Sequence, residues 1–137
     1  MAIVISKLFD DRIDKMKIRI KGNSLRYRLT KSEVSILASQ GIIQENTEFP
    51  GNTLTYAIKA SALDELTADF KQSTVTLNIP QAALQQWVTT NQVGVERHMP
   101  LPDGGSFFLL LEKDFKCIDV DANEDQSDFF ENPHLTC

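Results

Sequence analysis

The sequence predicts an α+β domain, built on a curved or barrel-like, mainly antiparallel sheet of about seven to eight strands with two main helices. Three observations support this fold class. Short stretches alternate apolar and polar residues, which is the period of a strand with one buried face. Turn-forming residues such as Pro50-Gly51-Asn52 separate these stretches. Two longer stretches, 31–40 and 81–90, carry apolar residues at helical spacing.

The first predicted element is a β-hairpin over residues 17–29, with a two-residue turn at Gly22-Asn23. Such a turn places Ile20 opposite Leu25 and leaves the apolar residues of both strands on one face. The other face carries basic side chains: Lys17, Arg19, Lys21, Arg26 and Arg28. Like charges opposite each other destabilise a sheet. We therefore expect an anion to lie against this face, and these five residues are the predicted binding site.

The remaining elements follow in order. Thr30 and Glu33 form a capping box at the start of the first helix, and Gly41 ends it. A proline, Pro80, precedes the second helix, and proline is favoured at helix starts. The other segments are predicted as strands 42–49 and 53–60, a short helix within 61–72, and strands 74–79, 93–99 and 107–112.

The order of elements suggests an internal duplication. Hairpin, helix 31–40 and two strands are followed by strand 74–79, helix 81–90 and two more strands. A shift of about fifty residues places Val34 on Leu84 and Leu37 on Trp87. The sequence therefore predicts a repeated β-α-β-β unit.

Charge and composition divide the chain into an N-terminal extension (1–15), one domain (16–118) and an acidic C-terminal segment (119–137). The chain has 137 residues and a net charge of −5. Residues 1–31 hold nine basic and three acidic side chains, so 9 − 3 gives +6, whereas residues 114–137 hold one and seven, so 1 − 7 gives −6. No secretory signal or membrane span is predicted, and a cytoplasmic location is expected.

Several functions can be weighed against the basic hairpin. A small anionic ligand, phosphorylated or otherwise, fits better than nucleic acid, because the protein is acidic overall and Tyr27 is the one aromatic residue among the basic ones. Alternatively, Glu45, Glu48, Glu112 or the acidic segment could neutralise the hairpin. The acidic segment could also bind a protein partner, which would make the chain an interaction module.

The sequence contains no recognisable catalytic motif, and no cofactor is predicted. No metal site is predicted either: Asp119-x-Asp121-x-Asn123 begins like a calcium loop, but its sixth and twelfth positions are Glu124 and Phe130. The two cysteines, Cys117 and Cys137, do not form a disulfide framework.

The opening Met16-Lys-Ile-Arg-Ile-Lys-Gly-Asn-Ser-Leu-Arg26 resembles that of a family of small uncharacterised bacterial proteins, a domain of unknown function. The closing Glu112-Lys-Asp-Phe-Lys-Cys117, followed by Glu124-Asp125, is similar to the end of the same family. This resemblance implies a bacterial, cytoplasmic protein with no established activity.

In outline the chain also resembles the triphosphate tunnel (CYTH-type) superfamily, whose duplicated units close around a charged channel. That likeness implies a metal-dependent phosphohydrolase, with Glu45, Glu48 or Glu112 as metal ligands. The superfamily opens with Glu-x-Glu-x-Lys, whereas the strand here is Lys17-Ile-Arg-Ile-Lys21. The departure favours anion binding without hydrolysis.

Overall fold

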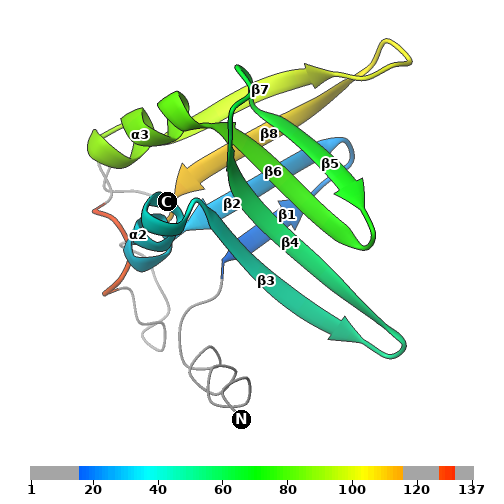
Figure 1. Ribbon diagram of the computed structural model, residues 1–137, viewed down its shortest axis with the longest axis horizontal. Helices are drawn as coiled ribbons and strands as arrows, with labels where there is room; N and C mark the ends of the chain where they lie inside the picture. The colour runs from blue at the N-terminus through cyan, green and yellow to red at the C-terminus, as the bar shows by residue number, and fades with distance from the viewer. Residues whose placement is uncertain (1–15, 116–126, 132–137) are drawn as a thin grey trace.

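The computed structural model describes residues 16–115 and 127–131, which form eight strands and two helices (Figure 1). In chain order the elements are β1 (Lys17–Ile20), β2 (Ser24–Leu29), α2 (Lys31–Gln40), β3 (Ile42–Phe49), β4 (Asn52–Ser61), β5 (Thr67–Lys71), β6 (Thr74–Pro80), α3 (Gln81–Thr89), β7 (Gly94–Pro100) and β8 (Ser106–Lys113). The predicted α+β character, the two helices and the number of strands are confirmed. The predicted extension (1–15), both cysteines and most of the acidic segment lie outside the described residues.

The strands form two four-stranded sheets, where the sequence had predicted one. The first sheet has the order β1-β2-β8-β7 and the second the order β3-β4-β6-β5; the described strands form no closed barrel. The hairpin pairings are antiparallel, but the central pairs β2·β8 and β4·β6 are parallel. Each central pair joins strands of two different hairpins, and alternation within a strand does not specify which strand of another hairpin lies beside it.

The element order is hairpin, helix, hairpin, and then the same again. Each sheet takes one hairpin from the first half of the chain and one from the second. The repeating unit thus has four strands around each helix, one more than the predicted β-α-β-β unit. In Figure 1 both helices lie at one end of the sheets, while the hairpin turns point toward the other end.

The strand that the sequence did not predict is β5, which lies where a short helix was predicted within 61–72. Leu63, Leu66 and Phe70 have helical spacing, but they do not form a buried face. Leu66 is 3% exposed, whereas Leu63 is 57% and Phe70 is 68% exposed. Leu66 and Ala68 instead pack on the core with the period of two that a strand requires.

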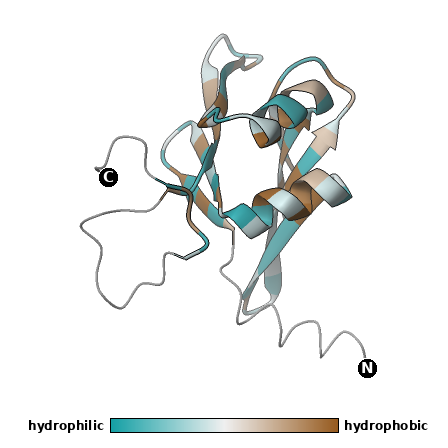
Figure 2. Ribbon diagram, turned by 90° about the vertical axis from the view of Figure 1, so that its left-hand side faces the viewer, coloured by the Kyte–Doolittle hydropathy of each residue, from teal (hydrophilic) through white to brown (hydrophobic). Residues whose placement is uncertain are grey.

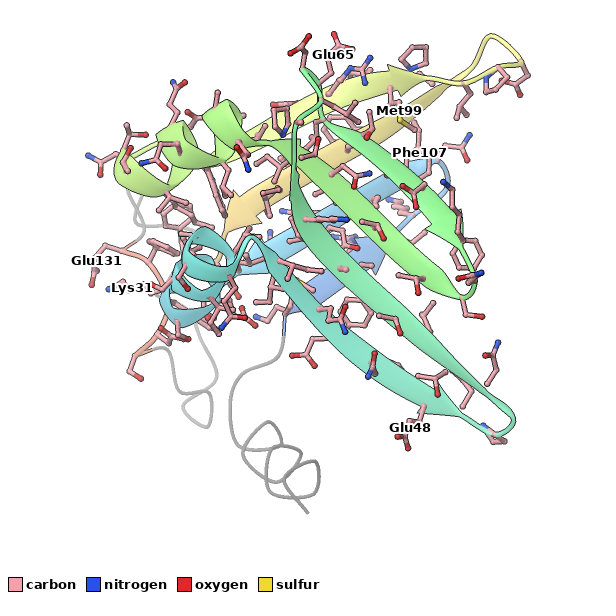
Figure 3. All side chains as sticks on the ribbon, viewed as in Figure 1. Lys31, Glu48, Glu65, Met99, Phe107 and Glu131 are labelled. Atoms are coloured by element: carbon pink, nitrogen blue, oxygen red, sulfur yellow. The ribbon has the colours of Figure 1, made fainter. Side chains whose placement is uncertain are left out.

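The core lies between the two sheets and under the helices. Its fully buried large side chains include Tyr27, Leu29, Leu37, Ile58, Leu77, Ile79, Trp87, Leu109 and Leu111. Both helices carry hydrophobic and hydrophilic residues, as amphipathic helices do (Figure 2). At the end of the sheets opposite the helices, the cross-strand pair Met99 and Phe107 packs against the core (Figure 3). Neither helix in the described part of the chain has the length and apolar character needed to cross a membrane.

Helix α2 has the predicted bounds and begins at the predicted capping box. The backbone N–H of Thr30 donates to Glu33 Oε1 at 2.8 Å. A second acid, Asp128, also binds this helix start, because the backbone N–H of Ser32 donates to Asp128 Oδ1 at 3.1 Å. Next to Asp128, Phe129 is buried. Residues 127–131 of the acidic segment are therefore packed on the domain.

Candidate functional site

The basic hairpin has the predicted register. Lys17 pairs with Arg28, and Arg19 pairs with Arg26. The turn is closed by the backbone N–H of Lys21, which donates to the carbonyl of Ser24 at 3.2 Å. We call the face that carries the five predicted cations (Lys17, Arg19, Lys21, Arg26 and Arg28) the basic face.

Burial of the opposite face fixes the direction of the basic face. Leu25, Tyr27 and Leu29 are at most 1% exposed. The hydroxyl of Tyr27 donates to the carbonyl of Val75 in the second sheet at 3.3 Å, which ties the hairpin to that sheet. Burial raises the pKa of Tyr27, so this donor stays protonated. Since alternate strand residues point to opposite faces, the cations point away from the core.

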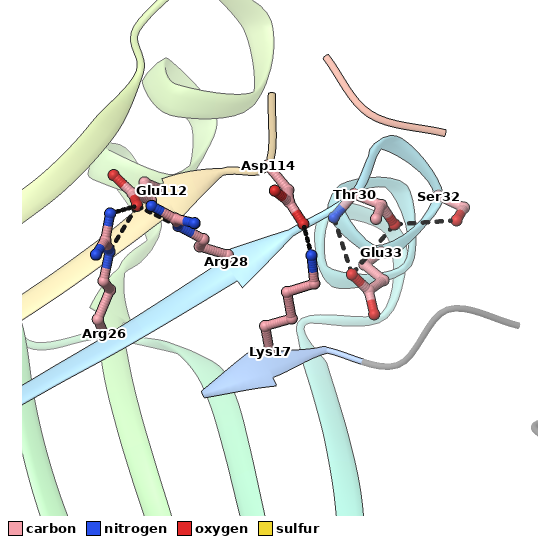
Figure 4. A network of polar contacts seen from close by, with 8 residues as sticks. All are labelled: Lys17, Arg26, Arg28, Thr30, Ser32, Glu33, Glu112 and Asp114. Carbon is pink, nitrogen blue, oxygen red and sulfur yellow. Dashed lines mark hydrogen bonds and ion pairs between the residues drawn. The ribbon is translucent and has the colours of Figure 1, made fainter. Parts of the chain in front are cut away.

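Glu112 of β8 holds the two arginines of β2. Its Oε1 accepts from Nε of Arg26 at 2.7 Å and from Nε of Arg28 at 2.6 Å, and Nη2 of Arg26 lies 2.6 Å away (Figure 4). Opposite Glu112 on β7 is Gly94, where a Cβ would lie 2.7 Å from the Leu111 carbonyl oxygen and 3.2 Å from the Glu112 Cβ. Glycine thus leaves room beside Glu112. One carboxylate orients both guanidinium groups while many of their N–H donors remain available.

Lys17 is held by a second acid at the end of β8. Its Nζ lies 2.9 Å from Asp114 Oδ2, and Asp114 is almost completely buried. The same ammonium group lies 4.8 Å from the centre of the Phe129 ring. Residues 127–131 therefore help to position a cation of the basic face.

Arg19 and Lys21 are exposed, and no acidic side chain of the described residues forms an ion pair with either. The expectation that the protein's own acids neutralise the hairpin holds in part, through Glu112 and Asp114. Five cations and two carboxylates leave a local charge of 5 − 2 = +3.

Four of the five predicted residues surround one hollow. It has a volume of about 350 Å³ and is lined by Lys17, Ile18, Arg19, Arg26 and Arg28. Lys21 lies nearer the turn and is not part of the lining. The hollow thus offers four cations from two adjacent strands, a suitable arrangement for an oxyanion.

The acids named for a metal site do not come together. Glu45 and Glu48 lie on β3 of the second sheet, and Figure 3 shows Glu48 toward the far end of that strand. Glu112 lies on β8 of the first sheet and binds the arginines. Within residues 16–115 and 127–131, no three His, Cys, Asp or Glu side chains are grouped as metal ligands.

Sequence reasoning named Glu112 as one of several possible acids but did not identify it or Asp114 as partners of particular cations. Arg28 and Glu112 are 84 residues apart in the chain and become neighbours through the parallel pairing of β2 and β8. No local pattern encodes that contact.

The fold and site define a small two-sheet α+β protein with a basic hollow at a sheet edge. The chain belongs to a family of unknown function, DUF7009, whose model matches residues 16–134. This confirms the predicted membership of a family without an established activity. No curated protein and no solved structure matches the chain.

Proposed function

We propose that this protein is a non-enzymatic anion-binding module, and that the hollow on the basic face holds a phosphorylated or other anionic ligand. The observation that carries the proposal is that Lys17, Arg19, Arg26 and Arg28 line one hollow of about 350 Å³. Small-ligand sites in proteins have volumes of roughly 300 to 1,000 Å³.

The electrostatics of the site support this assignment. A local excess of three positive charges attracts anions, and Arg19 has no acidic partner in the described residues that a ligand would have to displace. Arginine grips phosphate and carboxylate oxygens with pairs of parallel hydrogen bonds. Because Glu112 and Asp114 already hold three of the cations, less side-chain entropy is lost when a ligand binds.

Thermal unfolding in the presence of tripolyphosphate tests the proposal. A ligand present at a hundred times its dissociation constant stabilises a protein by about 2.7 kcal/mol. For a domain of this size the unfolding midpoint should rise by several degrees. The rise should saturate with ligand and become smaller at high salt.

Arg19→Gln should abolish this rise without changing the midpoint of the free protein, because the Arg19 side chain is exposed. The matched control is Lys71→Gln, which removes one exposed cation from edge strand β5 of the second sheet. If both variants respond to tripolyphosphate as the wild type does, the ligand binds elsewhere.

A further inference from the structure

Strand β1 is an outer strand of the first sheet. The order β1-β2-β8-β7 places β2 on one side of it and no described strand on the other. An edge strand presents unpaired backbone N–H and C=O groups, on which another extended chain can form hydrogen bonds.

The hydrogen bonds of β2 show which groups of β1 point outward. The carbonyls of Asn23 and Leu29 accept from β8 and its continuation, at 2.9 Å from Phe108 N and 2.8 Å from Asp114 N. Odd-numbered residues of β2 therefore direct their backbone groups toward β8, and even-numbered residues toward β1.

The register then assigns the groups of β1. Arg19 pairs with Arg26, so its N–H and C=O point toward β2. Ile18 and Ile20 pair with odd-numbered residues of β2, so their N–H and C=O groups point to the free edge. Two residues thus offer up to four outward hydrogen-bonding groups.

The side chains beside this edge have distinct chemistry on the two faces. On the basic face, Lys17 and Arg19 line the hollow described above. On the other face Ile20 is 59% exposed, although it is apolar. A strand that alternates acidic and apolar residues would complement both faces.

The other three outer strands each carry at least one acidic side chain. Strand β3 carries Glu45 and Glu48, β5 carries Asp69, and β7 carries Glu96. Among the described edges, β1 alone has cations and no acid (Lys-Ile-Arg-Ile). An acidic strand would therefore add at β1.

We propose that the ligand of the basic face is an extended acidic segment of a partner protein, which adds to the first sheet as a further strand beside β1. The inference rests on the proposed function and specifies its ligand: carboxylates occupy the hollow while backbone hydrogen bonds hold the segment on the edge. A second copy of this chain does not fit, because pairing β1 with another β1 would place cations against cations.

The test uses a short fluorescent peptide of alternating glutamate and valine, together with two N-methylated versions. Methyl groups on alternate residues block either the N–H groups on one edge of the peptide strand or those on the other. One version should therefore bind as the parent does, and the other should bind roughly tenfold more weakly or worse. Equal affinity for both versions would overturn strand addition.

A protein variant gives an independent test. Ile20→Pro removes an outward N–H without removing a hydrogen bond between β1 and β2, and proline is tolerated in edge strands. It should weaken peptide binding by roughly tenfold and leave tripolyphosphate binding unchanged. The matched control Ile20→Val keeps the N–H and should bind both ligands normally.

The outcomes separate the two proposals. If tripolyphosphate binds and the peptide does not, strand addition is wrong and the anion site stands. If neither binds, the proposed function fails as well. Should Ile20→Pro fail to fold, the N-methylated peptides still decide the question with the wild-type protein.

Discussion

The two sheets are built alike but differ in chemistry on equivalent faces. In the first sheet, the hairpin pairs Lys17 with Arg28 and Arg19 with Arg26. In the second sheet, hairpin β5–β6 has the same register fifty residues later, and the matching pairs are Thr67 with Asn78 and Asp69 with Thr76. The neighbouring parallel strand places Glu112 beside Arg28 and Lys59 beside Asn78.

The polar contacts of the two faces differ accordingly. The side-chain amide of Asn78 donates to Asp69 at 3.2 Å and to the hydroxyl of Thr67 at 3.3 Å. The hydrogen bonds of this part of the second sheet thus involve one charged side chain and two neutral ones. The first sheet instead gathers two arginines on one carboxylate. Because the same topology forms without the cations in one sheet, we expect that the fold does not require them in the other. This difference favours a binding role for the basic face.

The apolar positions, in contrast, match between the halves. Leu29 and Ile79 are fifty residues apart, and both are fully buried. We expect Leu29→Ala and Ile79→Ala each to lower the free energy of unfolding by about 2 to 5 kcal/mol, through lost burial and the cavity left behind. Urea denaturation of both variants measures this. A small loss for one and a large loss for the other would contradict the equivalence of the two halves.

The helix starts sharpen the comparison. The N-cap residue of helix α2 is Thr30, and the buried acid Glu33 lies in its first turn. The N-cap residue of α3 is Pro80, and Ala83 is at the position that matches Glu33. Burial is the main reason that the pKa of Glu33 rises to about 7, with smaller increases from the charges of Glu45 and Asp128. Hydrogen bonds from Thr30 oppose the rise.

A carboxyl group whose pKa is raised on folding binds more protons in the native state, so stability falls as pH rises. We expect the free energy of unfolding to decrease by on the order of 2 kcal/mol between about pH 4.5 and pH 7 from this group. Urea denaturation across this range should show the decrease in the wild type and a smaller slope in Glu33→Gln. Asp64→Asn, at an exposed position, is the control and should keep the wild-type slope; an equal slope in Glu33→Gln would refute the assignment to Glu33.

The sequence predicted local structure well and distant pairing poorly. The turn at Gly22-Asn23 and the alternation around it determined the hairpin register, and a capping box with a C-terminal glycine determined helix 31–40. Both are interactions between residues near in the chain. The parallel pairs β2·β8 and β4·β6 depend on how separate hairpins pack together, so the two-sheet arrangement did not follow from periodicity.

The same distinction applies to the site. Alternation placed the five cations on one face, since it depends only on strand geometry. The contacts that organise them, from Glu112 and Asp114, come from the far end of the chain. Helical spacing also misassigned β5, because spacing alone does not show that Phe70 is exposed.

A direct test of the comparison replaces arginines of the first sheet with the residue types found at the matching positions of the second. The double variant Arg26→Thr, Arg28→Asn gives the first sheet the residues found at the matching positions, Thr76 and Asn78. Both arginines are partly exposed, and such ion pairs contribute little. We expect the free energy of unfolding to change by only about 1 kcal/mol, since the smaller Thr and Asn side chains would open Glu112, which is 15% exposed beside the arginines, to water.

Ligand binding should respond in the opposite way. Removing two of the four cations that line the hollow should abolish the stabilisation by tripolyphosphate, measured by thermal unfolding. The control is Thr76→Ser, which alters the matching position of the second sheet without changing charge. A large loss of stability in the double variant would show that the arginines serve the fold, and the contrast between the two sheets would then be structural. Retained binding with normal stability would place the anion site away from the basic face.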